Sequence, residues 1–471
     1  MKTSGSGKKP AGKKPNSPLR DETRSPARQV ATSVVHRVLE DEAFTAAVLD
    51  AALAREKLAR NDAALATELS FGTLRAYVRL RGWLEPLLRQ PFDKLEGWVR
   101  ASLLVAAYQL FYLPRIPTFA IVAESVALVK KKRGPGLAAL SNAILRKLAA
   151  ERETWLARAA ESPRLALPSW IQGALEASIG AEALAQWVEG SGNAPWTGLR
   201  AQSARISREA LAERLRQERP DAEIRLGSFA RHALLVRRAG PLQQLESYRE
   251  GLFTVQEEGA QLVIDMAAFR QGERAADLCA GRGNKTTQIA EAVGSAGEVL
   301  AADYYEEKLA QLERELLRLQ MQDHRVEWHA VDLSRGTGKL RAERDRVVVD
   351  APCTGLGTLH RRPELMLRLD PASIASMQAL QIQILSRAAT LVRRGGCLIY
   401  AVCSPLREEG AGTIETFLRQ SEAAWRPLLE PFLLRDKSWV PDELGGFCWG
   451  PWSGEKEGGT DAYQVYRLTR R

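Results

Sequence analysis

The sequence is poor in cysteine and histidine for its length, and it has no long apolar run. Its 471 residues include five cysteines, which are too few for a disulfide scaffold and form no C-x-x-C pair. The five histidines are scattered, so no zinc site is readable. No run of about 18 apolar residues is present, and no apolar region follows the basic N-terminus. We therefore expect a protein of the reducing cytoplasm with no metal site, no secretory signal and no membrane partner.

Positive charge is in excess, and more than half of the excess lies at the N-terminus. The formal net charge is +10, and residues 1–28 contribute +6 of it, since eight lysines and arginines there face only Asp21 and Glu22. We predict that residues 1–27 form a disordered basic tail, because they are rich in lysine, proline, glycine and serine. The tail either contacts nucleic-acid phosphate or is a solvated extension that adds solubility.

Between residues 28 and 160 the apolar residues recur at helical spacing. This pattern predicts an all-α domain with turns such as Gly134-Pro135-Gly136. Its basic run Lys130–Arg133 either contacts phosphate or is a solvated helix face. Besides a first helix near residue 30, helices are expected at about 44–56, 60–80, 95–113, 119–131 and 137–148.

Residues 161–250 predict a small α+β module. It has a helix over Ser169–Val188 and short strands over Ala222–Leu226 and Ala233–Arg237. Arginines interleaved with aromatic residues suit single-stranded RNA, although ordinary surface arginines give the same pattern. The residues concerned are Arg200, Arg205, Arg208, Arg231, Arg237 and Arg238, with Trp196 and Phe229.

From residue 251 to residue 471 the chain predicts a doubly wound α/β domain of Rossmann type. Four short apolar runs each lead to an acidic residue: Asp277, Asp303, Asp332 and Asp350. The first run is followed by the turn Cys279–Lys285 and then by a helix. Glycine lets a backbone approach a ligand, and a helix N-terminus offers unpaired N–H groups. The turn therefore predicts a nucleotide-type binding corner.

Two cysteines follow buried strands of this domain. An apolar strand leads to Asp350 and Cys353, and the run Cys397–Val402 leads to Cys403. A helix lies between them, and Gly395-Gly396 is expected to stop it. Because ligands of open α/β sheets bind at the carboxyl ends of the strands, we expect both cysteines to face one pocket. The other three cysteines are expected to be buried and inert.

Four motifs of the C-terminal half carry a family resemblance. They are DAPCTGLG with HRRPE (350–364), AVCSPLREE (401–409), FTVQEEGAQL (253–262) and DLCAGRGNKTT (277–287). These motifs resemble the Sun/RsmB family of RNA cytosine-5 methyltransferases, and residues 60–75, 113–117 and 136–148 resemble its N-terminal NusB-like domain. The resemblance covers nearly everything after the tail. It implies a NusB-like RNA-binding domain (28–160), an RNA-binding module (161–250) and an S-adenosylmethionine-dependent methyltransferase domain (251–471).

The resemblance also implies roles for single residues. Cys403 matches the family's nucleophile, and Cys353 matches its second cysteine, which helps to release the product. Asp350 would lie near the reacting base, and Asp332 would lie beside the adenine of the cofactor. The implied cofactor-binding set is Cys279, Ala280, Gly281, Arg282, Gly283, Asn284, Lys285, Asp303, Asp332 and Asp350.

Several positions depart from the family pattern. Arg282 and Asn284 stand where the family usually has proline and glycine, and Asn284 is expected to tolerate a left-handed backbone. Val402 replaces the usual threonine before the nucleophile, and the middle module has Arg200-Ala-Gln202 in place of Arg-x-Asn.

The leading hypothesis is methylation of carbon 5 of a cytosine in RNA, with 16S ribosomal RNA as the implied substrate. Carbon 5 is a weak nucleophile, and addition of a thiolate at carbon 6 makes it able to attack a methyl sulfonium. One alternative is a catalytically impaired RNA-binding factor of ribosome assembly. Another is a small-molecule methyltransferase, which would leave the RNA-type domains unexplained. A monomer is the default expectation.

Overall fold

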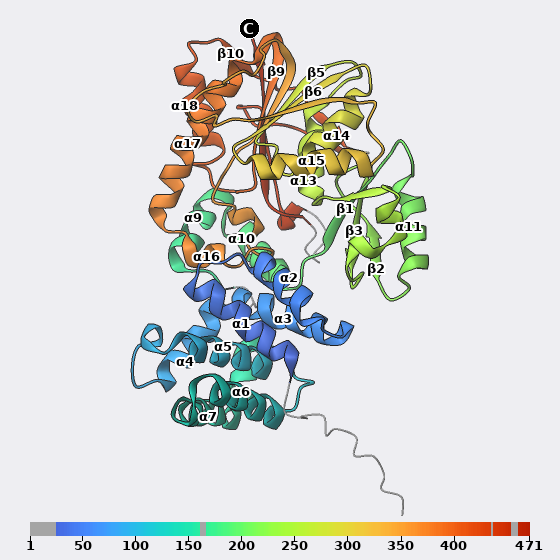
Figure 1. The fold of residues 1–471 in the computed structure, drawn as a ribbon. Helices are drawn as coiled ribbons and strands as arrows, with labels where there is room; N and C mark the ends of the chain where they lie inside the picture. The colour runs from blue at the N-terminus through green and yellow to red at the C-terminus, as the bar shows by residue number, and fades with distance from the viewer. Residues whose placement is uncertain (1–24, 161–165, 435–436, 454–459) are drawn as a thin grey trace, which may run out of the picture.

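The computed structural model describes residues 25–160, 166–434, 437–453 and 460–471. Residues 1–24 of the predicted tail lie outside this range, and the first helix begins at Pro26. Along the chain follow a helical domain, a small sheet module and a domain built on a large sheet (Figure 1). In the described residues, no helix is long and apolar enough to cross a bilayer.

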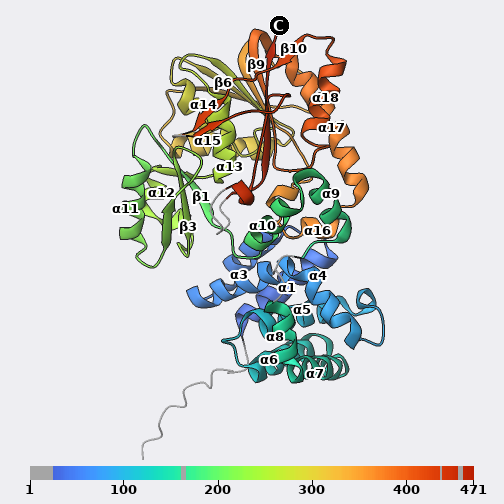
Figure 2. The ribbon, with the colours of Figure 1, turned by 180° about the vertical axis from the view of Figure 1, so that it is seen from behind.

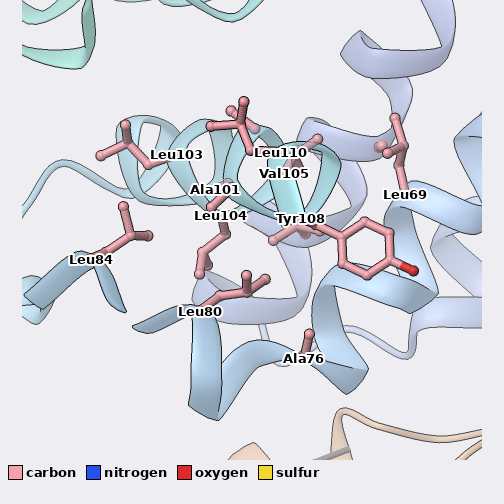
Figure 3. Packing of buried hydrophobic residues seen from close by; sticks show 14 of the residues in the cluster. Leu69, Ala76, Leu80, Leu84, Ala101, Leu103, Leu104, Val105, Tyr108 and Leu110 are labelled. Carbon is pink, nitrogen blue, oxygen red and sulfur yellow. The ribbon is translucent and has the colours of Figure 1, made fainter. Parts of the chain in front are cut away.

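Helix α5 is the centre of the helical domain. Fourteen of its 16 residues are buried, because its sequence is apolar on every side. Figure 3 shows Leu104 and Tyr108 of this helix among Leu80 and Leu84 of α4 and Leu69 of α3. The helices are α1 (Pro26–Glu40), α2 (Thr45–Glu56), α3 (Arg60–Arg75), α4 (Tyr77–Leu84), α5 (Gly97–Tyr112), α6 (Thr118–Arg133), α7 (Pro135–Ala150) and α8 (Arg152–Ala160).

The helix predicted at about 60–80 is wrong in one respect, because the structure divides it into α3 and α4. The chain turns at Ala76, where φ is −87° and ψ is 4°. This turn lets Leu69 before it and Leu80 after it both pack in the core around α5. The other helices predicted for this domain are confirmed to within a few residues.

The small module is a four-stranded antiparallel sheet in the order β2-β3-β1-β4. Helix α11 covers one face of the sheet, where Leu211 and Leu215 pack on Leu199 and Leu234. The fourth strand comes from residues after 250, so the sheet extends past the predicted end of the module. The elements are β1 (Thr197–Ala201), α11 (Arg208–Glu218), β2 (Glu223–Leu226), β3 (Ala233–Arg237), α12 (Glu246–Arg249) and β4 (Phe253–Val255).

The helix predicted over Ser169–Val188 is two helices, α9 (Ser169–Ile179) and α10 (Ala181–Ser191). They separate at Gly180, whose φ of +81° is in the left-handed region that favours glycine. Both helices pack against the large domain rather than the small sheet, since Leu175 and Trp187 share a cluster with Leu406. Figure 2 shows them between the helical domain and the large sheet.

The C-terminal domain has a mixed sheet in the order β10-β14-β9-β8-β5-β6-β7, with β13 paired to β14. The five neighbouring strands β9, β8, β5, β6 and β7 are parallel, while β14 pairs antiparallel with β9. Helices α13–α15 cover one face and α17 and α18 cover the other (Figures 1 and 2). The predicted doubly wound fold is confirmed. Its elements are α13 (Glu258–Ala267), β5 (Arg274–Leu278), α14 (Asn284–Val293), β6 (Glu298–Asp303), α15 (Glu306–Arg318), β7 (Arg325–Ala330), β8 (Arg344–Asp350), α16 (Leu365–Arg368), α17 (Pro371–Ala389), β9 (Val392–Val402), α18 (Ala411–Gln420), β10 (Trp425–Pro427), β11 (Phe432–Leu434), β12 (Lys437–Trp439), β13 (Gly446–Trp449) and β14 (Tyr463–Arg470).

The predicted helix stop at Gly395-Gly396 is wrong. Helix α17 ends at Ala389, and strand β9 begins at Val392. The two glycines lie inside the strand, where the pairing with β8 shifts register and Gly395 has a φ of +71°. Glycine therefore permits a bulge at this position instead of ending the helix.

Buried polar contacts join the helical domain to the segment that follows Cys353. Thr45 Oγ1 donates to Glu364 Oε2 at 2.7 Å, and an Arg75 guanidinium nitrogen donates to the carbonyl of His360 at 3.1 Å. Leu367 packs against the core of the helical domain. The helical domain thus supports a segment of the large domain directly.

Candidate active site

The predicted site residues meet at the carboxyl edge of the parallel strands. Strands β9, β8, β5 and β6 are neighbours in that order, and their carboxyl ends lead to Cys403, Asp350, Cys279 and Asp303. Because parallel strands all point the same way, these residues line one edge of the sheet. Asp332 follows β7, the next strand, and the amide of Val331 donates to the carbonyl of Asp303 at 2.9 Å.

The two strand-end cysteines are in contact. The Sγ atoms of Cys353 and Cys403 are 3.4 Å apart, which brings together residues 50 positions apart in the chain. Both are free thiols in partly buried positions. The contact with Cys403, together with burial, raises the pKa of the Cys353 thiol well above its usual value. Cys353 is therefore a thiol at neutral pH.

A lysine and an aspartate form an ion pair beside the cysteines. Lys285 Nζ, on the first turn of α14, lies 2.5 Å from Asp350 Oδ2 at the end of β8. Burial acts to lower the pKa of Lys285, but the Asp350 carboxylate outweighs it and the net pKa is raised. The Cys403 sulfur adds to this rise. Lys285 is therefore a fixed positive charge close to that sulfur.

The turn before α14 is built on left-handed residues. Cys279, Gly281 and Gly283 have φ values of +90°, +57° and +85°. Asn284 does not need the left-handed backbone that it was expected to tolerate, because it begins α14, and its Nδ2 donates to the carbonyl of Val255 at 3.1 Å. Arg282 is exposed. The replacements of proline and glycine are thus compatible with an open turn.

Asp303 is oriented by the backbone around it. Its Oδ2 accepts from the amide of Gly281 at 2.8 Å, and its Oδ1 accepts from the amide of Tyr305 at 3.0 Å. Asp332 is occupied similarly, since its Oδ1 accepts from the amide of Ser334 at 3.0 Å and its Oδ2 lies 3.2 Å from Arg335 Nε. Both carboxylates are held in place at the edge of the sheet.

Asp277 lies under the turn instead of at its rim. It is fully buried one residue before the end of β5, and its Oδ2 accepts from Thr286 Oγ1 at 2.6 Å. Its Oδ1 is buried with no hydrogen-bond partner in the described part of the chain. Burial raises the pKa of Asp277 to about 6.

Three of the arginines and aromatics of the small module fit neither alternative, RNA contact or ordinary surface residue, because they are buried. Arg200 is 1% exposed and binds Gln256, Thr287 and Glu291 across the boundary with α14. Trp196 and Phe229 are also buried. A sequence pattern cannot show this for Arg200 and Phe229, because their partners come from the large domain. The ring of Trp196 instead lies against Arg225 and Arg237 of the same module, each 4.3 Å from its centroid.

Sequence reasoning missed one buried carboxylate at the site. Glu409 is 0% exposed and binds Thr354, the residue after Cys353. The only sequence signal was its position inside the motif AVCSPLREE. The C-terminal strand was missed as well: Gln464 of β14 donates to the carbonyls of Ser404 and Leu406, both at 2.8 Å, and so holds the segment after Cys403.

Comparisons with known proteins identify the family. The family model described as 16S rRNA methyltransferase RsmB/F matches residues 265–431, and the NusB family model matches residues 25–150. The probable ribosomal RNA small subunit methyltransferase B of Synechocystis sp. is 31% identical over 86% of this chain and 91% of its own length. The chain belongs to the RsmB/F family of 16S rRNA methyltransferases.

Other members of the RsmB/F family match over similar lengths. The ribosomal RNA small subunit methyltransferase B of Pseudomonas putida is 31% identical over 84% of this chain and 90% of its own length. Among solved structures, PH0851 covers 95% of this chain and 99% of its own, with a TM-score of 0.76 and 20% identity. NSun6 from Pyrococcus horikoshii, solved with SFG, has a TM-score of 0.54, 17% identity, and covers 64% of this chain and 98% of its own. These structures support the fold.

Proposed function

We propose that this protein methylates carbon 5 of a cytosine in 16S ribosomal RNA through a covalent cysteine adduct. The observation that carries the proposal is the pair of cysteine sulfurs 3.4 Å apart, at the ends of adjacent parallel strands and beside the ion pair of Lys285 and Asp350. A methyltransferase that adds its methyl group to an oxygen or a ring nitrogen needs no such pair. Activation of a pyrimidine carbon does need a thiolate.

The proposed reaction begins at Cys403. Its thiolate forms a bond to carbon 6 of cytosine, and the electron pair displaced onto the ring makes carbon 5 nucleophilic. Lys285 supplies a positive charge near the Cys403 sulfur in this step. Asp350, when protonated, would donate a hydrogen bond to ring nitrogen 3 during attack. Carbon 5 then takes the methyl group and its proton passes to water. The bond between Cys403 and carbon 6 breaks, and its electron pair returns to the sulfur.

S-adenosylmethionine, when bound, would supply the electrophilic methyl group. The residues proposed to hold it are those of the turn Cys279–Lys285 together with Asp303, Asp332 and Asp350. Several features fit such a ligand: the left-handed turn at the N-terminus of α14, the oriented Asp303 carboxylate and the unpartnered Asp277 Oδ1.

A methylation assay tests the proposal. Wild type, Cys403→Ala and Cys448→Ala are incubated with unmodified 16S ribosomal RNA and labelled S-adenosylmethionine, and the nucleosides are separated by mass spectrometry. We expect labelled 5-methylcytidine from wild type and Cys448→Ala, because β14 lies between β13, which carries Cys448, and β9, which leads to Cys403, and none from Cys403→Ala. Label in another nucleoside would contradict the carbon 5 chemistry. RNA binding without label in wild type would favour an RNA-binding assembly factor.

A further inference from the structure

Glu409 is a buried carboxylate without a cationic partner. It lies just before α18 and is 0% exposed. Its Oε1 accepts from the amide of Thr354 at 2.8 Å and from Gln381 Nε2 at 3.1 Å, and its Oε2 accepts from Thr354 Oγ1 at 2.6 Å. Within the described ranges, it is in no ion pair with lysine, arginine or histidine. An unpaired buried charge is costly, so its retention needs a reason.

The bonds of Glu409 hold the peptide on both sides of Cys353. Thr354 follows the cysteine, and Gln381 also donates from Nε2 to the carbonyl of Pro352, which precedes it, at 3.0 Å. The network reaches the second cysteine too, since Thr354 Oγ1 lies 3.4 Å from Ser404 Oγ. Glu409 and Gln381 therefore fix the backbone that carries the Cys353 sulfur.

The charges that act most strongly on Cys353 are negative. The contact with Cys403 and burial raise the pKa of Cys353, and the negative charges of Glu409 and Asp350 raise it further. Tyr400, on β9, also interacts with Cys353, and Tyr463, on β14, interacts with Cys403. Burial raises the pKa of both phenols, so they stay neutral. On the other side, the Lys285 cation interacts with Cys403.

We propose that Glu409 sets the direction of the hydrogen bond between the two cysteines: its buried carboxylate keeps Cys353 as the protonated donor and leaves the Cys403 sulfur as the acceptor. Glu409 is then a positioning residue that acts through Cys353. The proposal rests on the proposed function for its role in catalysis. When the bond between Cys403 and carbon 6 breaks, its electron pair returns to the Cys403 sulfur, which the Cys353 thiol stabilises by donation. The proton of carbon 5 passes to water.

Alkylation of the free protein tests this inference. Wild type, Glu409→Gln and Glu408→Gln are treated with iodoacetamide across a range of pH, and the modification of each cysteine is followed in its own tryptic peptide. Glu408→Gln is the matched control, since it removes an exposed carboxylate from the adjacent residue. In wild type, Cys403 should react at lower pH than Cys353. In Glu409→Gln, alkylation of Cys353 at neutral pH should be about tenfold faster, and in Glu408→Gln it should be unchanged.

Two results would overturn the inference. One is unchanged alkylation of Cys353 in Glu409→Gln while circular dichroism shows a native fold. The other is a wild-type protein in which Cys353 reacts at lower pH than Cys403, and this readout stands even when the variant does not fold. Because the assay uses neither RNA nor cofactor, its outcome is independent of the methylation assay. If wild type fails to methylate RNA while the cysteines of all three proteins are alkylated as predicted, only the proposed function is contradicted.

Discussion

At the scale of single residues, the site keeps two carboxylates in unfavourable surroundings. Glu409 has no cationic partner in the described residues, and Asp277 is buried beneath the turn Cys279–Lys285 with one oxygen that has no partner among them. Buried polar groups lower stability unless they are paired. Such costs are often found at functional sites, where position matters more than stability.

The burial of Asp277 predicts that the stability difference between wild type and Asp277→Asn depends on pH. Its pKa is about 6 in the folded protein against 3.8 for the ordinary group, so the folded state binds the proton more tightly. The contribution of Asp277 to the free energy of unfolding therefore falls as pH rises through this window, by about 3 kcal/mol in total. Asp277→Asn does not titrate, and its free energy of unfolding relative to wild type should rise by about that amount from pH 4 to pH 7. Urea unfolding at a series of pH values measures this difference. The prediction is contradicted if the free energies of unfolding of the two proteins change with pH in parallel.

The residues of the site could be predicted only where the sequence places them at strand ends. Asp350, Cys353 and Cys403 each follow a short apolar run, and parallel strands bring such positions to one edge. Glu409 could not be assigned a role, because its partner Thr354 lies 55 positions away. The burial of Arg200 was equally hidden, since it depends on how two domains dock.

At the scale of the elements, the turn between β5 and α14 shapes the proposed cofactor site. Gly283 is the N-cap residue of α14, and a Cβ built on it would lie 2.5 Å from Leu312 Cδ1. Gly281 is also left-handed, but a Cβ there would point into open space. The packing of the turn therefore requires glycine at position 283 but leaves room for a side chain at position 281.

Gly283→Ala should be much more harmful than Gly281→Ala. Both substitutions force alanine into a left-handed conformation, which costs about 1–2 kcal/mol. Only Gly283→Ala also displaces Leu312, so its free energy of unfolding should fall by about 3 kcal/mol or more. Calorimetric titration with S-adenosylmethionine should show at least about tenfold weaker binding for Gly283→Ala than for Gly281→Ala. Equal effects of the two substitutions would show that Leu312 does not constrain the turn.

The elements that could be predicted are those with a strong local pattern. The apolar runs of β5, β6 and β8 are buried on both faces, which gives a continuous signal. The bulge in β9 was missed because a glycine pair signals a helix end and a strand bulge equally. Strand β14 was not predicted, although its pairing with β9 completes the sheet beside Cys403.

At the scale of the whole molecule, buried polar contacts tie the three parts together. Arg200 links the small module to α14 through Glu291 at 2.6 Å and Thr287 at 2.9 Å. Thr45 and Arg75 of the helical domain bind the segment after Cys353. The parts that resemble RNA-binding domains thus support the catalytic domain structurally. Contacts between distant segments leave no local sequence pattern. The three domains could therefore be predicted from the sequence, but the way they pack together could not.

The Arg200 link predicts a large loss of stability on substitution. Arg200→Met removes a fully buried guanidinium and leaves the partly buried Glu291 without this partner, and the free energy of unfolding should fall by about 3 kcal/mol. Arg238→Met is the control, because the side chain of Arg238 is 75% exposed and its ion pair is with the surface residue Glu223. Its free energy of unfolding should change by less than about 0.5 kcal/mol. If urea unfolding shows similar small changes for both variants, Arg200 does not hold the module.

The central claim is that Cys403 forms the covalent bond to the RNA and Cys353 helps to break it. Cys353→Ala incubated with 16S ribosomal RNA and S-adenosylmethionine should therefore accumulate an adduct that survives denaturation. Digestion and mass spectrometry of that adduct measure which side chain carries the nucleotide. We expect methylated cytidine on the peptide that contains Cys403. An adduct on any other residue, or methylated RNA formed by Cys403→Ala, would contradict the account.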